Sequence, residues 1–296
     1  MNTGRRTLII NADDLGYTRG VNLAVARCRA DGAVRSTTLM ANGAAFEDAV
    51  AMIGKAQGLG VGIHLVLTEL RPLSPPQRIP GLVTAEGFLP STPGDLMLSL
   101  LRGKISAEDI RRELSLQVEK VLDCGITPTH LDSHKHVHVL PQVLDAVIDV
   151  ARKYSIHWIR NPFDRTLARH VMPVLDQGQR ALFCKQHLKA RLVLAFRSAF
   201  FRRLREAGMY TPDHFFGVSL TGIWNEAAMT RLLYRLPPGL SEWMFHPGNC
   251  DAELQARPTR LKKQREKERN LLLSPVLKNL LLAHDIALRY FGQEIA

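Results

Sequence analysis

Short apolar runs alternate with longer amphipathic stretches along most of the chain. The first run, Thr7 to Ile10, is apolar and β-branched, as expected of a strand buried on both faces. The segment from Gly20 to Asp31 then places Val21, Val25 and Cys28 at helical spacing. The same alternation predicts further strands at 36–41, 61–65, 129–133, 158–160, 215–220 and 241–245, and further helices at 45–56, 110–122, 143–154, 186–207, 226–236 and 259–273.

Strands that alternate with helices predict a parallel sheet whose faces are covered by helices. About seven such units, without a dinucleotide-binding glycine motif after the first strand, favour an irregular (β/α) barrel of the TIM type. The length of 296 residues suits a single catalytic barrel domain over 1–296. A stretch rich in proline and glycine at 71–94 interrupts the pattern. We expect it to be an insertion over the active-site face, because long loops in compact domains are usually functional or mobile.

The composition is that of a globular protein with a strong positive charge. Hydrophobic residues make up 46% of the chain, and the formal net charge is +11. This charge leaves three kinds of partner open: nucleic acid, an anionic membrane surface and an anionic substrate. The four cysteines are widely spaced, which argues against a disulfide framework and against a cysteine zinc site. With no recognisable leader and no apolar run near the ~20 residues of a membrane span, we expect a cytoplasmic protein.

Ionisable residues stand at the ends of four predicted strands. Asp13 and Asp14 follow the first strand, His64 lies in the third, and His246 follows a late one. Active sites of (β/α) barrels lie at the carboxyl ends of the strands, so these side chains are expected to converge. Adjacent carboxylates also suit a division of labour, in which one binds metal and the other acts as a base.

The fourth of these strands carries ionisable residues at alternate positions, which an extended chain directs to one face. They are His130, Asp132, His134, His136 and His138. We expect a column of potential ligands at the mouth of the barrel, in which some members bind a metal and others orient the ligating imidazoles. Two histidines and one carboxylate, with positions left for water, are typical of a catalytic metal site. Such a site accepts zinc, magnesium or manganese.

Four motifs together resemble the YdjC-like carbohydrate deacetylases. That family includes chitooligosaccharide deacetylases and deacetylases associated with hopanoid glycan biosynthesis. The motifs occur in order and at suitable spacing, and the third is long enough to be specific. They are NADDLG at 11–16, GIHL at 62–65, THLDSHKHVH at 129–138 and FHPG at 245–248.

The resemblance implies a hydrolase that removes the acetyl group from an N-acetylglucosamine-type sugar. It implies one divalent ion, Mg²⁺ or Zn²⁺, bound by Asp14, His64 and His134, with Asp13 as the base and His246 as the acid. The substrate is either a free oligosaccharide or a glycolipid such as an N-acetylglucosaminyl hopanoid. Further residues are expected to bind the substrate or to orient the ligands, and these are Arg160, Asp132, His136 and His138.

A basic amphipathic segment at 179–205 contains eight cations and no acidic residue. One interpretation is a barrel helix with a buried apolar face, and the other is a helix that contacts the inner face of the membrane near a lipid-linked sugar. The cations are Arg180, Lys185, Lys189, Arg191, Arg197, Arg202, Arg203 and Arg205.

Other functions remain alternatives at this point. A metal-dependent phosphoesterase would use the same kinds of ligand, although no glycine-rich phosphate loop is present. A non-catalytic metal or sugar binder and a basic nucleic-acid-binding protein are further alternatives. We expect no nucleic-acid partner, because neither zinc-finger spacing nor a helix-turn-helix signature occurs. A homodimer is also open.

Overall fold

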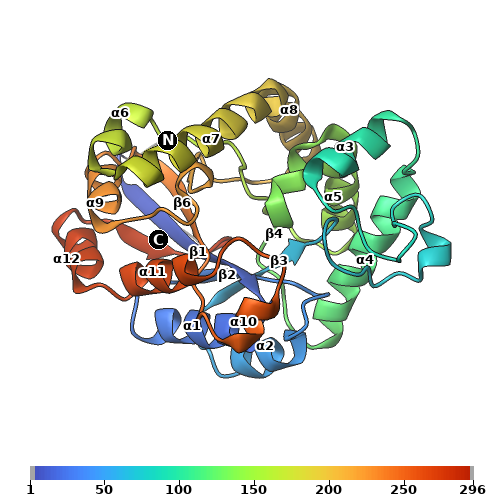
Figure 1. Cartoon of the computed structure of the whole chain (residues 1–296), viewed down its shortest axis with the longest axis horizontal. Coiled ribbons are helices and arrows are strands. Elements are labelled where there is room, and N and C mark those ends of the chain that lie inside the picture. Colours follow the sequence, from blue (N-terminus) through green and yellow to red (C-terminus); the bar gives the residue numbers. More distant parts are fainter. Residues whose placement is uncertain (1–3, 294–296) are drawn as a thin grey trace.

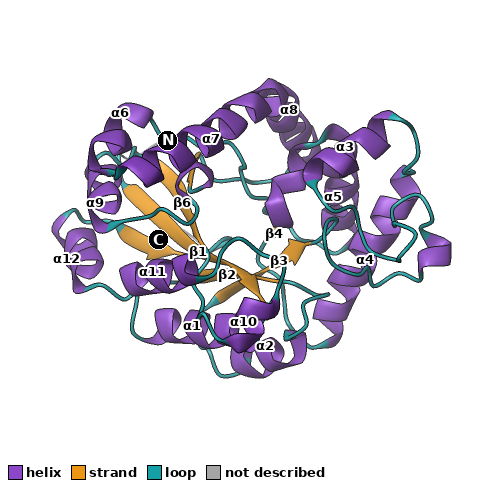
Figure 2. Ribbon diagram, in the orientation of Figure 1, coloured by secondary structure: helices purple, strands orange, loops and turns teal. Residues whose placement is uncertain are grey.

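The centre of the molecule is a curved sheet of parallel strands with helices on the outside (Figure 1, Figure 2). The computed structural model describes residues 4–293. The strands are β1 (Arg6–Leu15), β2 (Ser36–Leu39), β3 (Gly60–Leu65), β4 (Leu131–Ser133), β5 (His214–Phe216), β6 (Gly239–Phe245) and β7 (Ala287–Arg289). They lie in the order β4-β3-β2-β1-β6-β5, and β7 pairs with the first half of β1.

Isolated bridges connect the two ends of this row of strands. Leu131 of β4 bridges to Ile159, and Phe215 of β5 bridges to Asp164. The backbone amide of Arg160 also donates to the carbonyl of Leu131 at 3.0 Å. The chain between Ile159 and Asp164 therefore spans the gap between β4 and β5. The result is an irregular (β/α) barrel, which confirms the fold class predicted from the sequence.

Helices surround the strands, and several begin at polar caps that the sequence already displays. Thr18 accepts from the backbone amide of Val21 at 3.2 Å, and Ser106 accepts from that of Asp109 at 3.0 Å. None of the helices within residues 4–293 is long and apolar enough to cross a membrane. The helices are α1 (Arg19–Ala30), α2 (Phe46–Ile53), α3 (Pro93–Leu101), α4 (Ala107–Asp123), α5 (Pro141–Lys153), α6 (Ala168–Val171), α7 (Gln177–Leu192), α8 (Arg197–Ala207), α9 (Glu226–Tyr234), α10 (Ala252–Ala256), α11 (Lys263–Leu272) and α12 (Pro275–Ala283).

Several elements differ from the sequence prediction for identifiable reasons. The strand predicted at 215–220 ends at Phe216, because Gly217 adopts φ 143° and turns the chain. The segment predicted as a strand at 158–160 makes only isolated bridges. The single helix predicted at 186–207 is instead two helices, α7 and α8, which a 3-10 turn separates.

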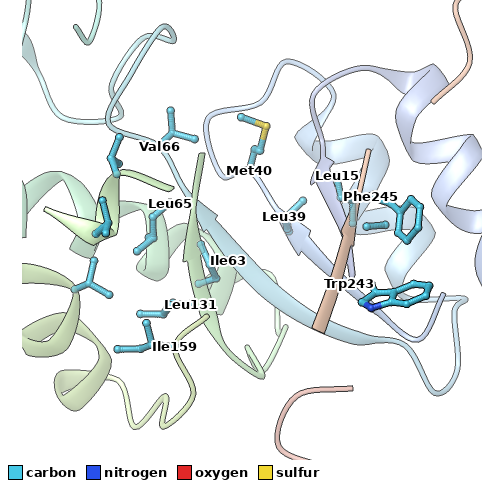
Figure 3. Packing of buried hydrophobic residues seen from close by; sticks show 14 of the residues in the cluster. Leu15, Leu39, Met40, Ile63, Leu65, Val66, Leu131, Ile159, Trp243 and Phe245 are labelled. Atoms are coloured by element: carbon cyan, nitrogen blue, oxygen red, sulfur yellow. The ribbon is translucent and has the colours of Figure 1, made fainter. Parts of the chain in front are cut away.

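The strands separate an apolar outer layer from a polar interior, because successive side chains point to opposite faces. The guanidinium of Arg160 contacts carboxylates of three different strands, from Asp13, Asp132 and Glu242, so these side chains face the inside of the barrel. The alternate positions of the same strands pack beneath the helices (Figure 3). They include Leu131 of β4 and Trp243 and Phe245 of β6.

Candidate metal centre

The end of β1 directs two neighbouring carboxylates to different partners. Asp14 adopts a left-handed backbone conformation with φ 67°, which aspartate tolerates better than most residues. The carboxylate of Asp13 contacts Arg160, whereas that of Asp14 contacts His64, His134 and Arg265. The turn at Asp14 therefore places the Asp14 carboxylate beside that of Asp13, with a different set of partners.

Asp14, His64 and His134 come together at the carboxyl ends of β1, β3 and β4. Asp14 Oδ1 lies 3.3 Å from Nε2 of His64 and 3.3 Å from Nδ1 of His134. These three atoms lie within 4.8 Å of one another, which suits three ligands of one metal ion. His64 belongs to β3, and His134 begins the 3-10 turn η2 (His134–Val139) directly after β4.

The imidazole of His64 is oriented by a carboxylate on its other side. Its Nδ1 lies 2.7 Å from Oδ1 of Asp132, and Thr38 donates to Oδ2 of the same carboxylate at 3.2 Å. Burial lowers the pKa of His64, but the carboxylates of Asp132, Asp14 and Asp13 together outweigh burial and raise the pKa to about 10. With Nδ1 donating to Asp132, Nε2 is the nitrogen that faces Asp14.

A second carboxylate, from Glu69, orients His134. Oε2 of Glu69 lies 3.0 Å from Nε2 of His134, and Oε1 contacts Nζ of Lys135. Glu69 adopts φ 69° in the loop that follows β3. Burial lowers the pKa of His134, but its contacts with Asp14 and Glu69 together outweigh burial, so the pKa is raised. Glu69 was not among the residues predicted from the sequence.

The donor set and its surroundings fit a divalent cation. Asp14 Oδ1 is buried and has no hydrogen-bond donor, although two imidazole nitrogens lie 3.3 Å away. Burial raises the pKa of Asp14, but nearby Arg265 and the two histidines hold it well below its usual range. An ionised carboxylate and two imidazoles, each held by another carboxylate, form a common arrangement of catalytic metal sites.

Arg160 links three carboxylates inside the barrel. Its Nη1 and Nη2 donate to the two oxygens of Asp13 at 2.6 Å each, and Nη1 lies 2.5 Å from Oδ2 of Asp132. Its Nε donates to Oε1 of Glu242 at 2.8 Å. Burial raises the pKa of Asp13, but the Arg160 guanidinium outweighs it, so this pKa is lowered. For Glu242 burial prevails over Arg160 and raises the pKa to about 8.

Helix α11 contributes two buried side chains that support the site from behind. Arg265 Nη2 donates to Oδ2 of Asp14 at 2.5 Å, which leaves Oδ1 for the histidines. One turn later, Glu268 accepts from the backbone amides of His246 at 2.6 Å and Gly222 at 2.7 Å. A single helix thus fixes both a candidate ligand and the loop that carries His246.

His246 follows β6 and lies at the same end of the barrel as the cluster. Its side chain is 13% exposed, and its Nδ1 lies 3.8 Å from Oε2 of Glu268 without a hydrogen-bond partner. A positive charge on His246 also contributes to lowering the pKa of Asp13. His246 therefore belongs to the electrostatic surroundings of the candidate base while remaining partly open to solvent.

The prediction that the chain stays extended to His138 is wrong. Strand β4 ends at Ser133, and Lys135 and His136 adopt left-handed conformations with φ 56° and 55°. His138 is buried, with Nδ1 2.6 Å from the hydroxyl of Ser133 and Nε2 3.2 Å from the carbonyl of Arg160. Burial together with Arg160 lowers its pKa to about 3. His138 therefore supports the turn, away from the three candidate ligands.

The rings of His136 and His130 pack against aromatic side chains rather than against the candidate ligands. The ring of His136 packs edge-on against Phe215, and its buried Nδ1 has no hydrogen-bond partner. The ring of His130 stacks on Phe291 with centroids 3.6 Å apart. Of the five alternating residues, only His134 joins the candidate ligands, and Asp132 orients one of them.

Comparison with protein families matches residues 7–283 to the YdjC-like protein family. The chain belongs to the YdjC-like family. The match covers every strand from β1 to β6 and all the candidate ligands, which confirms the resemblance carried by the four motifs.

Relatives of this YdjC-like protein include several proteins named as deacetylases. A carbohydrate deacetylase of Vibrio cholerae serotype O1 is 31% identical over 293 residues, 98% of this chain and 96% of the relative. One from Geobacillus stearothermophilus is 42% identical over 171 residues, 58% of this chain and 65% of the relative. A chitooligosaccharide deacetylase of an Enterobacter species is 38% identical over 171 residues, 55% and 65% of the two chains. The alignments with the latter two relatives thus span just under two thirds of their length.

A solved structure shares the fold of the YdjC-like protein. The crystal structure of an Enterococcus faecalis protein, described as a cellobiose-phosphate cleavage protein, superposes with a TM-score of 0.75. It covers 97% of this chain and 98% of its own length at 24% identity. At this level of identity the likeness establishes the fold and nothing further.

Proposed function

We propose that this YdjC-like protein is a metal-dependent hydrolase that removes the acetyl group from an N-acetylglucosamine-type sugar. The observation that carries the proposal is the convergence of the buried Asp14 and His64 with the partly buried His134, with the carboxylate of Asp13 next in the chain. The deacetylase names of relatives that align over nearly the whole chain support the choice of reaction.

Asp14, His64 and His134 would hold the divalent ion. When bound, such an ion supplies Lewis-acid polarisation of the acetyl carbonyl and lowers the pKa of a bound water. The mixed set of one oxygen and two nitrogen donors suits Zn²⁺, and further oxygen donors from water admit Mg²⁺. In this proposal Asp132 and Glu69 fix the two imidazoles in the orientation that presents a free nitrogen to the ion.

Asp13 is the proposed general base. Its carboxylate is ionised at neutral pH and held in one orientation by Arg160 on both oxygens and by Asn11 at 2.8 Å. A base must be unprotonated and correctly placed before it accepts a proton from water, and these contacts supply both conditions. The geometry favours Arg160 as the residue that orients Asp13, since its guanidinium contacts both oxygens of Asp13 and is itself held by Asp132 and Glu242.

His246 is the proposed general acid. The departing sugar amine requires a proton, and an imidazole that is partly exposed can both deliver it and be reprotonated from solvent. Glu268 holds the backbone of His246 in place, so the imidazole approaches the substrate from the β6 side of the barrel. His136 and His138 support the turn after β4 in this scheme and take no part in proton transfer.

Acetate release is the experiment that tests the proposal. After chelation, Mg²⁺, Mn²⁺ or Zn²⁺ is restored and release from di-N-acetylchitobiose and from an N-acetylglucosaminyl lipid is measured. We expect metal-dependent release from at least one of them, since both carry the acetamide that the site is proposed to cleave.

Three variants separate the proposed roles. Asp13→Asn should retain metal and lose about 10²–10⁴-fold in turnover, because the base is removed and the ligands are kept. His134→Ala should lose metal binding itself, and the exposed His157→Ala is the control that should change neither. Full activity in Asp13→Asn, or undiminished metal binding in His134→Ala, would contradict the assignment.

A further inference from the structure

Helix α7 has two faces with apolar residues, and within residues 4–293 the rest of the chain covers only one of them. Phe183, Gln186 and Ala190 are buried against the body of the molecule. On the opposite side Leu188 and Leu192 are 62% and 67% exposed. The helix therefore packs against the barrel without these two leucines, so contacts with the barrel do not explain why they are apolar.

The exposed leucines belong to a continuous apolar stripe. At 3.6 residues per turn, exposed residues spaced by three or four positions line up along one side of a helix. We define the outer stripe as Ala181, Cys184, Leu188 and Leu192, all of which are exposed. Figure 1 shows α7 along the edge of the molecule, and the exposure of these four side chains shows that the described part of the chain leaves this side of the helix uncovered.

Cations flank the outer stripe on both sides. Lys185 and Lys189 project on one side of it and Arg180 and Arg191 on the other, at the angles that the helical repeat dictates. Between Asp176 and Glu206 the chain carries no acidic residue. The stripe is thus an apolar ridge between two rows of positive charge.

We propose that the outer stripe of α7 docks on the surface of an anionic lipid bilayer. In the docked state Leu188 and Leu192 enter the boundary between headgroups and acyl chains, and the flanking cations lie over the lipid phosphates. Apolar side chains bordered by Lys and Arg on both sides are the pattern of helices that lie in a membrane interface. Each Lys or Arg near an anionic bilayer raises the affinity about fivefold, so four cations and two leucines support reversible binding.

Charge and shape together favour a membrane over a protein partner. A planar anionic surface is contacted equally by both rows of cations, which matches their placement on the two sides of the ridge. A groove lined by another protein would require complementary carboxylates on both walls.

The docking face borders the end of the barrel that carries the candidate metal centre. On the buried side of α7, Gln186 donates to the carbonyl of Ser219 at 3.0 Å, and His187 lies 3.1 Å from the Ser219 hydroxyl. Ser219 lies in η5 (Val218–Leu220), just beyond the carboxyl end of β5. Docking brings this end of the barrel to the headgroups. If the proposed deacetylase function holds, which this step requires, the acetylated sugar is carried on a lipid anchor.

Vesicle co-sedimentation of the full chain tests the docking independently of any activity. Vesicles of phosphatidylcholine alone are compared with vesicles that also contain phosphatidylglycerol, at low and high salt. We expect binding only to the anionic vesicles, weakened by salt because the cations contribute. Leu188→Ser/Leu192→Ser should bind at least tenfold more weakly, because the apolar ridge is removed while every charge is kept.

The matched control is Leu23→Ser/Leu282→Ser, which removes two leucines of similar exposure, 64% and 72%, from α1 and α12. It should bind anionic vesicles like the wild type. Absent binding of the wild type, or equal loss in both double variants, would overturn the proposal. So would a wild-type dimer that Leu188→Ser/Leu192→Ser converts to a monomer, since a second copy of the chain would then cover the stripe. None of these readouts depends on deacetylation, so failure of docking and failure of the proposed function are distinguishable.

Discussion

At the scale of single residues, carboxylates outside the candidate ligand set decide how the two histidines present their nitrogens. Asp132 fixes His64 through Nδ1, and Glu69 fixes His134 through Nε2, so the nitrogens that remain are of opposite types. The two imidazoles therefore approach Asp14 Oδ1 from different ring positions. A metal site built in this way depends on the orienting carboxylates almost as much as on the ligands.

Removal of the carboxylate behind His134 should weaken metal binding. We expect Glu69→Ala to lower the affinity for Zn²⁺ about 10–100-fold, because the imidazole loses the acceptor that fixes its tautomer and orientation. The Zn²⁺ affinity of Glu69→Gln should lie between those of Glu69→Ala and the wild type, since an amide oxygen can still accept a hydrogen bond from the imidazole of His134. Isothermal titration calorimetry measures the affinities. Glu86→Ala, an exposed carboxylate in the same loop, is the control, and a loss of equal size there would contradict the role of Glu69.

The buried carboxyl of Glu242 should make stability depend on pH. Its pKa is raised from 4.5 to about 8 by burial, so between these values the folded protein holds a proton that the unfolded chain releases. Wild-type stability therefore falls as the pH rises through that window. The side chain of Glu242→Gln is uncharged at every pH. Its free energy of unfolding should therefore rise relative to that of the wild type by at most about 1.4 kcal/mol per pH unit from pH 4.5 to 8, and this difference should stay constant above pH 8. Urea unfolding at several pH values measures this, and a constant difference would contradict it.

The candidate ligands and the orienting carboxylate of Asp132 were predictable from the sequence, whereas the supporting Glu69 and Arg265 were not. Asp14, His64 and His134 stand at the ends of apolar runs, and parallel strands bring such ends together. Glu69 lies in an irregular loop, where no periodicity indicates the direction of a side chain. Arg265 lies in a helix with six charged residues among its first seven, so the pattern of the sequence does not indicate which of them is buried.

At the scale of elements, loops and turns explain where the sequence prediction and the structure differ. Long apolar runs with clear periodicity became the strands and helices expected of them. The short chain between Ile159 and Asp164 closes the barrel through isolated bridges, which leave no recognisable pattern. The alternation of histidines after Ser133 suggested an extended strand, but two left-handed residues turn the chain there. Periodicity alone does not reveal such a reversal.

Helix α4 anchors the start of the loop rich in proline and glycine. The buried carboxylate of Glu113 accepts from the backbone amides of Leu73 at 3.0 Å and Ser74 at 2.8 Å, and from Gln117 at 2.8 Å. Glu113→Ala should destabilise the protein by about 2–4 kcal/mol, because these donors lose a charged acceptor in a buried position. Hydrogen exchange should also accelerate in the loop first.

The exposed Glu108→Ala on the same helix is the control for this prediction. Its ion pairs with Arg111 and Arg112 are at the surface and contribute less than about 1 kcal/mol. Urea unfolding gives the free energies, and mass spectrometry locates the exchange. If Glu113→Ala and Glu108→Ala had similar effects, the anchoring role would be wrong.

At the scale of the whole molecule, the barrel has a polar interior that carries the candidate site. One arginine and three carboxylates occupy the space that aliphatic side chains fill in many (β/α) barrels. Breaking such a buried network by removing one partner leaves charges unpaired, which is strongly unfavourable. The arrangement therefore couples the chemistry of the site to the integrity of the barrel, since the same Asp13 and Asp132 belong to both.

A divalent cation should stabilise the entire fold, because its candidate ligands follow or lie in different strands of the barrel. Binding to Asp14, His64 and His134, which come together only in the folded chain, adds about 2.7 kcal/mol at a free metal concentration of 100 times the Kd. For a chain of this size, that corresponds to a rise in Tm of about 5 °C or more. Differential scanning calorimetry with and without Zn²⁺ or Mg²⁺ measures the shift. His134→Ala should abolish it and the exposed His157→Ala should preserve it. An equal shift in both variants would place the cation elsewhere, and no shift in the wild type would argue against a site in the folded protein.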